Sequence, residues 1–111
     1  MPETRKITRN SMWADTVVKM RYRTRYGKGQ NSVVTIQAHI ANLSSKGMLV
    51  VTDDIIPADT EVELQLIFSN NIGMEAIGRV LRNDTHGVAL GFTQIDTVKL
   101  GECIMERLNS N

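Results

Sequence analysis

The sequence predicts a small, mainly β domain of six antiparallel strands followed by one C-terminal helix. Apolar and polar residues alternate in six short segments, which is the pattern of strands with one buried face. Clusters of Gly, Asn, Ser, Asp or Pro separate these segments, as expected of turns. After residue 96 the apolar period becomes that of a helix. Short strands at regular spacing indicate an antiparallel barrel or sandwich.

The strands are expected, in order, at residues 13–26, 32–41, 48–52, 61–68, 74–81 and 88–92. In the first of them Val18 and Met20 share one face, and Lys19 and Arg21 the other. Gly-rich residues 26–31 connect it to the second strand. The longest loop is expected at 53–60, and turns at 42–47, 69–73 and 82–87.

The C-terminal helix is expected to pack on the sheet through one apolar stripe. Its members stand at i, i+3, i+4 and i+8: Leu100, Cys103, Ile104 and Leu108. Asp96 and Thr97 are the candidate caps at its start. Cys103 lies within the stripe and is therefore interpreted as a core residue.

The amino-acid composition limits the classes of function that this chain can have. A chain of 111 residues has room for one domain, and its 41% hydrophobic and 23% charged content is typical of globular proteins. Eight of the 13 Lys and Arg residues fall within residues 1–28, but the net charge of +1 argues against a general nucleic-acid binder. The single Cys excludes an intrachain disulfide and favours a reducing compartment. The chain has no apolar leader and no apolar run long enough for a membrane span, so we expect a cytoplasmic protein without membrane insertion.

Two polar segments stand out from this background. Residues 1–12 lack periodicity and are interpreted as a flexible arm, which carries Arg5 and Arg9 four positions apart. The second segment is Asn42-Leu43-Ser44-Ser45-Lys46-Gly47, between two expected strands. On residue types alone it is a tight strand connection, because Asn and Ser bond to nearby backbone and Gly accepts unusual backbone angles.

Together, the R-x-x-x-R arm and the following N-x-S-x-x-G turn resemble the PilZ domain family. The resemblance covers nearly the whole chain and implies a stand-alone, single-domain member. It implies a six-stranded antiparallel β-barrel with a C-terminal helix, here an arm at 1–12 and a barrel domain at 13–111. It also implies a function, which is binding of the bacterial second messenger cyclic di-GMP.

The resemblance assigns roles to five residues. Arg5 and Arg9 would clamp the phosphates and cover the guanine faces. Asn42 and Ser44 would bond to one guanine and the adjoining phosphate, and Gly47 would hold the turn and leave space for the ligand. The residue types suit this chemistry, because guanidinium forks onto phosphate oxygens or onto guanine O6 and N7, and stacks on rings.

The sequence departs from the family pattern at two positions. Asn42 stands where the family often has Asp, which keeps the hydrogen bonding and removes a charge. Thr4 stands where an additional Arg favours a stacked ligand pair, so we expect one ligand per chain. Three further cations, Lys6, Arg79 and Arg82, stay open as ligand contacts, with solvated positions as the alternative.

A second R-x-x-x-R match, Arg21 to Arg25, lies within the first expected strand. Alternation places its arginines on one solvated strand face, whereas the family places the arginine arm before the first strand. The second match is therefore not assigned to the ligand.

Other reactive residues do not form a recognisable site. His39 and His86 lack ligand-spaced neighbours, and Asp53-Asp54 lacks the Gly and Glu of a calcium loop. No nucleophile–base pairing and no phosphate-binding G-x-x-x-x-G-K-[ST] occurs. We therefore expect a non-enzyme without metal or cofactor.

The expected function is a cyclic di-GMP receptor or adaptor. Ligand would order the arm and present a new surface to an unidentified protein effector in motility, pilus or biofilm regulation. One alternative is a PilZ-like adaptor that acts by protein contacts without ligand. Another is a small barrel that binds single-stranded nucleic acid, against which stands the scarcity of stacking side chains, with one Trp, two Tyr and two Phe.

Overall fold

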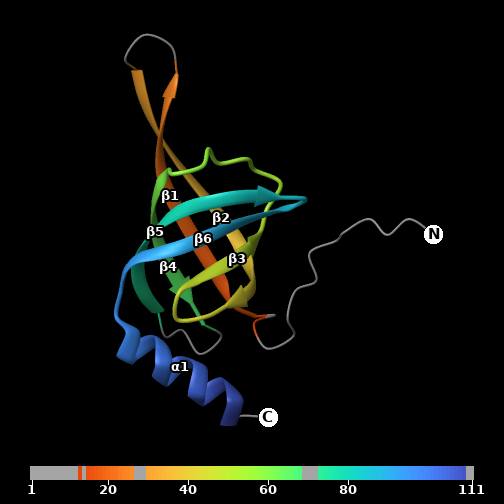
Figure 1. Cartoon of the computed structure of the whole chain (residues 1–111), viewed down its shortest axis with the longest axis vertical. Coiled ribbons are helices and arrows are strands. Elements are labelled where there is room, and N and C mark those ends of the chain that lie inside the picture. Colours follow the sequence, from red (N-terminus) through yellow and green to blue (C-terminus); the bar gives the residue numbers. More distant parts are fainter. Residues whose placement is uncertain (1–12, 14, 27–29, 69–72, 110–111) are drawn as a thin grey trace, which may run out of the picture.

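Six strands and one helix follow one another in the computed structural model (Figure 1), which describes residues 13, 15–26, 30–68 and 73–109. The elements are β1 (Val17–Tyr26), β2 (Gln30–Leu43), β3 (Gly47–Val51), β4 (Glu61–Ile67), β5 (Gly73–Asp84), β6 (Gly87–Ile95) and α1 (Thr97–Asn109).

The strands form a closed barrel in the order β1-β2-β3-β6-β5-β4. Every neighbouring pair is antiparallel, and the pairing of β1 with β4 closes the barrel. The predicted fold class, a six-stranded antiparallel barrel with a C-terminal helix, is confirmed. Closure matters because it leaves no sheet edge along the length over which all strands pair.

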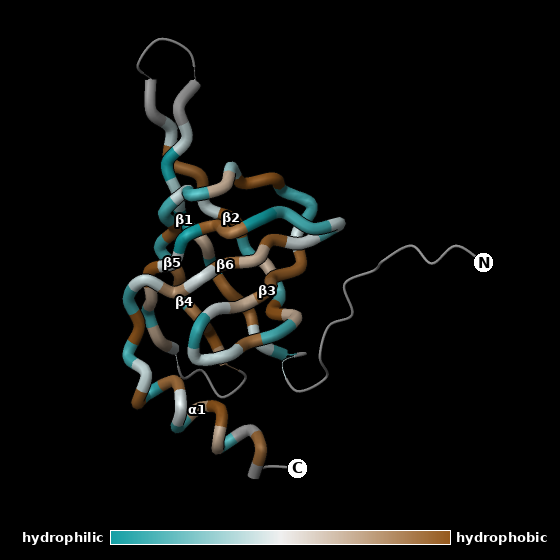
Figure 2. The backbone as a smooth tube through the Cα atoms, viewed as in Figure 1, coloured by the Kyte–Doolittle hydropathy of each residue, from teal (hydrophilic) through white to brown (hydrophobic). Residues whose placement is uncertain are grey.

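The barrel interior is filled by the apolar residues of the alternating pattern. In β4, Val62, Leu64 and Leu66 are buried while the intervening residues are exposed. Brown and teal alternate along the strands in Figure 2 for this reason. At the end where β1 begins and β4 ends, the rings of Trp13 and Phe68 pack 6.1 Å apart at a tilt of 52°. Trp13 is 1% exposed and belongs to the core.

Helix α1 starts where the capping pattern predicted. The carboxylate Oδ1 of Asp96 accepts from Lys99 N at 3.0 Å, so Asp96 is the N-cap. Leu100 is fully buried, and Cys103 and Ile104 pack partly buried against the core. The predicted stripe is wrong at its last position, since Leu108 is 55% exposed. The cause is visible in Figure 1, where the second half of α1 runs beyond the barrel. Within the described part of the chain, no helix is long and apolar enough to cross a membrane.

Three strands are longer than the sequence predicted. β2 continues through Asn42 and Leu43, β5 continues to Asp84, and β6 continues to Ile95. The ladders shift register between Ile40 and Asn42 and between Val80 and Arg82. These bulges break the alternation on which the sequence-based boundaries depended. The turns expected at 42–47 and 82–87 are consequently shorter, because β2 ends at Leu43 and β5 at Asp84.

Candidate functional site

The turn between β2 and β3 is held by its own hydrogen bonds. Ser44 N donates to the carbonyl of Gly47 at 2.9 Å, and Lys46 N donates to Ser44 Oγ at 3.3 Å. The carbonyl of Lys46 accepts from Phe92 N of β6 at 2.8 Å. The turn is therefore tied both to itself and to the neighbouring strand, and it presents a rigid surface.

Asn42 supports the entry to the turn and leaves one polar group available. Its Oδ1 accepts from Leu43 N at 2.9 Å, while its side chain is exposed. Within the described part of the chain its Nδ2 has no recorded partner, so it can donate to a ligand. Ser44 is also exposed, and its hydroxyl, which accepts from Lys46 N, donates only at the long distance of 3.4 Å to the Gly47 carbonyl. That hydroxyl can therefore turn to a stronger acceptor such as a phosphate oxygen.

Gly47 is required by a close approach of two strands. It pairs with Gly91 of β6, and a Cβ at position 47 would lie 2.1 Å from the carbonyl oxygen of Leu90. Its φ lies outside the left-handed region, so lack of a side chain, and not backbone freedom, explains the glycine. The last residue of the N-x-S-x-x-G pattern thus brings the turn against β6.

A single row of cross-strand partners connects the turn to β5. Asn42 pairs with Leu49, Leu49 with Ala89, and Ala89 with Arg82. Neighbouring strands lie about 4.8 Å apart, so the backbones of Asn42 and Arg82 are about 14 Å apart. Because the side chain of Ala89 is small, the middle of the row projects little from the sheet surface.

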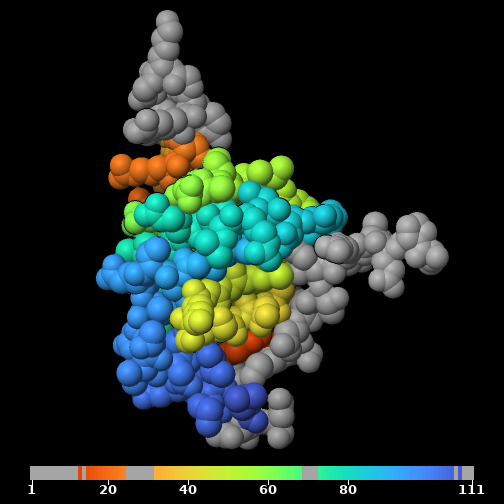
Figure 3. Space-filling model, viewed as in Figure 1, coloured from red at the N-terminus to blue at the C-terminus, as the bar shows by residue number. Residues whose placement is uncertain are grey.

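This row forms the floor of a shallow depression of about 250 Å³. Its lining residues are Asn42, Leu43, Ser44, Gly47, Met48, Leu49, Arg82 and Ala89. All three turn residues predicted from the sequence to be in the site are therefore brought together. Figure 3 shows the surrounding segment (yellow) at the surface, between β5–β6 (cyan) and α1 (dark blue).

Both polar ends of the row face outward because of the two bulges. In a regular strand Asn42, two positions after the inward Ile40, would also face inward, and the bulge at Ala41 turns it outward. Arg82, two positions after the buried Val80, would likewise face inward in a regular strand, and the bulge at Leu81 turns it outward. The alternation of apolar and polar residues does not predict either bulge, so Arg82 could not be assigned to the site from the sequence.

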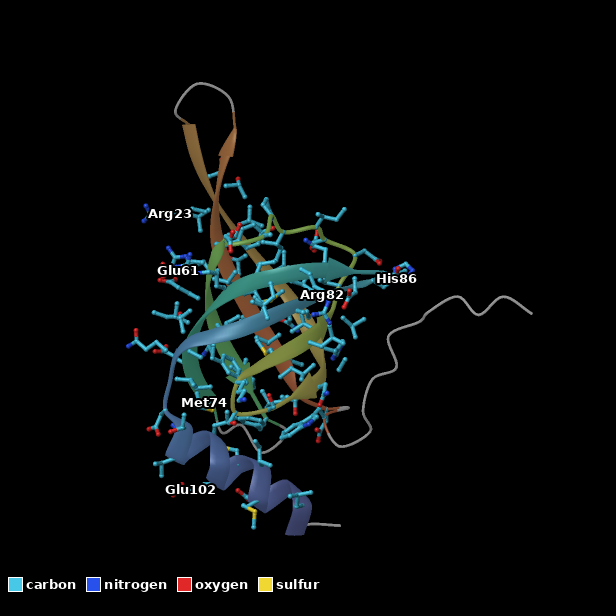
Figure 4. The ribbon with its side chains drawn as sticks, viewed as in Figure 1. Arg23, Glu61, Met74, Arg82, His86 and Glu102 are labelled. Atoms are coloured by element: carbon cyan, nitrogen blue, oxygen red, sulfur yellow. The ribbon has the colours of Figure 1, made fainter. Side chains whose placement is uncertain are left out.

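Arg82 is the cation among the residues that line the depression. Its side chain is 65% exposed, and its Nε lies 3.2 Å from Asp84 Oδ1 (Figure 4). Exposed ion pairs of this kind contribute little stability, so Arg82 can exchange the carboxylate for a ligand anion. Arg79 does not line the depression, although it pairs with Gly91, the partner of Gly47, and so lies on the row next to that of Arg82.

The arm residues Thr4, Arg5, Lys6 and Arg9 lie outside the described part of the chain. The point from which the arm departs is nevertheless described. Thr16 accepts from Ile40 N through its carbonyl at 3.3 Å, and Ile40 lies two positions before Asn42. Thr16 therefore lies beside the end of β2 that leads into the turn.

Two larger depressions, of about 660 and 880 Å³, lie elsewhere on the barrel surface. The first is lined mainly by outward residues of β1, β4, β5 and β6, among them Lys19 and Glu75. The second lies between β1 and the β3–β4 loop. Neither of these two depressions is lined by a residue of the turn. The depression at the N-x-S-x-x-G turn is therefore smaller than others on the barrel surface.

Comparison with protein families shows a match to the PilZ domain over residues 3–106. The match spans the barrel and most of α1, and it includes the R-x-x-x-R arm and the N-x-S-x-x-G turn. Comparisons with curated proteins and with solved structures found no match. The closed barrel, the turn pinned against β6 and the family match over most of its length agree, and the chain belongs to the PilZ domain family.

Proposed function

We propose that this PilZ domain is a receptor for cyclic di-GMP that transmits the signal to a protein partner. The observation that carries the proposal is the depression with Asn42, Ser44 and Gly47 at one end and Arg82 at the other. It combines hydrogen-bonding groups with a cation that the fold places on the same row. A PilZ domain is a binding and adaptor domain, so the proposal is one of recognition and not of catalysis.

The depression on its own is smaller than a typical small-molecule site, which encloses about 300–1,000 Å³. A ligand with two guanines and two phosphates therefore needs a second wall. We assign that wall to the arm, with Arg5 and Arg9 binding phosphates and stacking on guanine. Asn42 Nδ2 and Ser44 Oγ would bind guanine and phosphate from the barrel side.

The chain is long enough for this arrangement. Trp13 is packed in the core and its carbonyl accepts from Thr16 N, so the reach of the arm is counted from Trp13. Arg9 lies four positions before Trp13, and an extended chain spans about 3.4 Å per residue, so the backbone of Arg9 can reach about 14 Å from Trp13. Asn42 lies two residues beyond Ile40, the partner of Thr16, or about 7 Å. The proposed division is thus an arm at 1–12 and a barrel domain at 13–111, and ligand would order the arm over the barrel.

The direct test is calorimetric titration of cyclic di-GMP into the protein and its Arg9→Ala variant. Loss of a charge-assisted contact costs about 1.5–3 kcal/mol, so Arg9→Ala should weaken binding by about 10- to 150-fold. Lys19→Ala is the matched control, because Lys19 is an exposed cation on β1 outside the depression. We expect the control to bind within about twofold of the parent.

The same titration separates the proposal from its main rival. We expect one ligand per chain, because Thr4 replaces the Arg associated with ligand pairs. No binding by the parent protein would contradict the receptor function and favour an adaptor that acts by protein contacts alone. Location in the cytoplasm and an output in motility, pilus or biofilm regulation belong to the proposal and depend on identifying the partner.

A second expected result concerns Arg82. Arg82→Ala should weaken cyclic di-GMP binding about tenfold, because it removes the cation at the far end of the row. Arg23→Ala is the matched control, because Arg23 is an exposed arginine of β1 outside the depression. Equal affinities of the two variants would show that Arg82 does not contact the ligand.

A further inference from the structure

Helix α1 has a second apolar stripe besides the one that packs on the barrel. Three of its members are large and exposed: Val98 is 71% exposed, Met105 56% and Leu108 55%. Gly101 is the fourth member and lies between them, because residues three, four and seven apart share one helix face. At 3.6 residues per turn, this second stripe is centred about 120° around the helix from the buried Leu100. The fold of one chain therefore leaves the second stripe uncovered.

The spacing of the second stripe is the same in both directions along the helix. Its members are separated by three, four and three positions, so an antiparallel copy of α1 presents the same spacing. With a two-fold axis level with Cys103, Val98 of each copy lies opposite Leu108 of the other. Gly101 of each copy then lies opposite Met105 of the other. Alternating separations of three and four are those of packed helix pairs, so the stripe is complementary to itself.

Gly101 is the residue that favours a second copy of α1 as the occupant. Glycine weakens the interior of a helix, and the fold of one chain gives no reason for it here. A Cβ at position 101 would meet nothing within 4 Å, and the backbone is not in the left-handed region that needs glycine. In the antiparallel pair, the long and flexible side chain of Met105 from the second copy would fill this open space. The two-fold axis would create this contact twice.

The charges on α1 argue against a lipid surface as the occupant. Helices that lie on membranes carry mainly Lys and Arg on their polar face. The described polar side chains of α1 include Lys99, but also Glu102 and Glu106, which an anionic membrane repels. Figure 1 shows the second half of α1 running beyond the barrel, where another helix can approach it.

We propose that α1 is a self-association surface, through which two copies of this chain form an antiparallel helix pair. The uncovered stripe of each copy would pack on that of the other, with Met105 against Gly101 on both sides of the axis. The proposal goes beyond the receptor function and does not depend on it.

The expected dimer is weak and depends on protein concentration. A helix of 13 residues is about 20 Å long, and a contact of this length buries less than the 1,200–2,000 Å² or so of a stable interface. Glu102 of both copies would also lie beside the axis, where like charges repel. We therefore expect a dissociation constant of about 10 μM to 1 mM.

The first test is sedimentation equilibrium of the whole protein without cyclic di-GMP, from about 10 μM to about 1 mM. The average mass should rise with concentration toward twice that of the chain. Met105→Lys places a charge in the helix contact, and Gly101→Gln fills the space opposite Met105. Each should weaken association at least about fivefold. Lys and Gln are good helix formers, so α1 itself should remain intact, which circular dichroism checks.

Each variant has a matched control outside the stripe. Ile55→Lys makes the same kind of change at a residue that is 79% exposed in the β3–β4 loop. Lys99→Gln introduces the same side chain as Gly101→Gln, on the polar face of α1. Both controls should associate within about twofold of the parent, because surface changes away from a contact have little effect.

Cross-linking tests the antiparallel direction. Val98→Cys and Leu108→Cys proteins are oxidised separately and as a mixture in which one of them is labelled with ¹⁵N. The mixture should yield a covalent dimer of the two variants, identified by its mass, and each variant alone should yield little. The parent controls for its single thiol, Cys103, which is partly buried against the barrel core.

Three results would overturn the proposal. They are a monomer at every concentration, association that Met105→Lys and Gly101→Gln leave unchanged, and cross-linking of each cysteine variant with itself in place of the mixture. A protein that stays monomeric but binds phosphatidylcholine vesicles, and loses that binding in Met105→Lys, would assign the stripe to a lipid surface instead.

Discussion

The Gly47→Ala variant is expected to lose about 3 kcal/mol of unfolding free energy. A Cβ at this position would lie 2.1 Å from the carbonyl oxygen of Leu90, and this contact is with backbone, which cannot rotate away. Relief requires β3 and β6 to separate where Gly47 pairs with Gly91. Overpacking of this kind costs about 1–3 kcal/mol, and a backbone clash belongs at the upper end. Urea denaturation followed by circular dichroism measures the loss.

The same substitution at Gly101 provides the control. Gly101 lies inside α1, and a Cβ there would meet nothing within 4 Å. Alanine is better than glycine in a helix interior by about 1 kcal/mol, so Gly101→Ala should raise stability. Opposite signs of the two changes in unfolding free energy would show that the loss at Gly47 comes from the close approach of β3 and β6, and not from Gly→Ala substitution in general. If Gly47→Ala were as stable as the parent and lost only ligand affinity, space for the ligand would be the sole reason for the glycine.

Trp13→Ala should reduce the unfolding free energy by about 3–5 kcal/mol, the usual cost of removing a buried aromatic ring. Trp13 is 1% exposed, packs on Phe68, and accepts through its carbonyl from Thr16 N at 3.0 Å. It therefore closes one end of the barrel and fixes the place from which the arm departs. Because Trp13 is the chain's single tryptophan, unfolding of the variant is followed by far-ultraviolet circular dichroism.

Two control variants show whether the cost comes from burial. Trp13→Phe keeps a ring against Phe68 and should recover more than half of the loss. Val98→Ala truncates a side chain that is 71% exposed on α1, and should change stability by less than about 0.5 kcal/mol. A Trp13→Ala variant as stable as Val98→Ala would place Trp13 outside the folding core.

The element types were predictable because they depend on local periodicity. Alternation in β4 and the helical spacing around Leu100 each hold over several residues, and the structure keeps both. The Asp96 cap was likewise readable, because capping involves a side chain and a backbone group three residues apart. The failure at Leu108 has a tertiary cause: periodicity shows which helix face is apolar, but not how far the barrel extends beneath it.

The sequence by itself determined the order of six strands and a helix, the N-x-S-x-x-G turn, and the arginine arm that precedes the first strand. Only the tertiary structure decided which residues from other strands meet that turn. The bulges at Ala41 and Leu81 change which way Asn42 and Arg82 face, and the ladders β2–β3, β3–β6 and β6–β5 place them on one row. A bulge arises from pairing between strands that are distant in the sequence, so no local pattern in either strand predicts it. The separation of β1 from β4 beyond the pair Arg21–Glu63 has the same origin, because the rest of β4 pairs with β5.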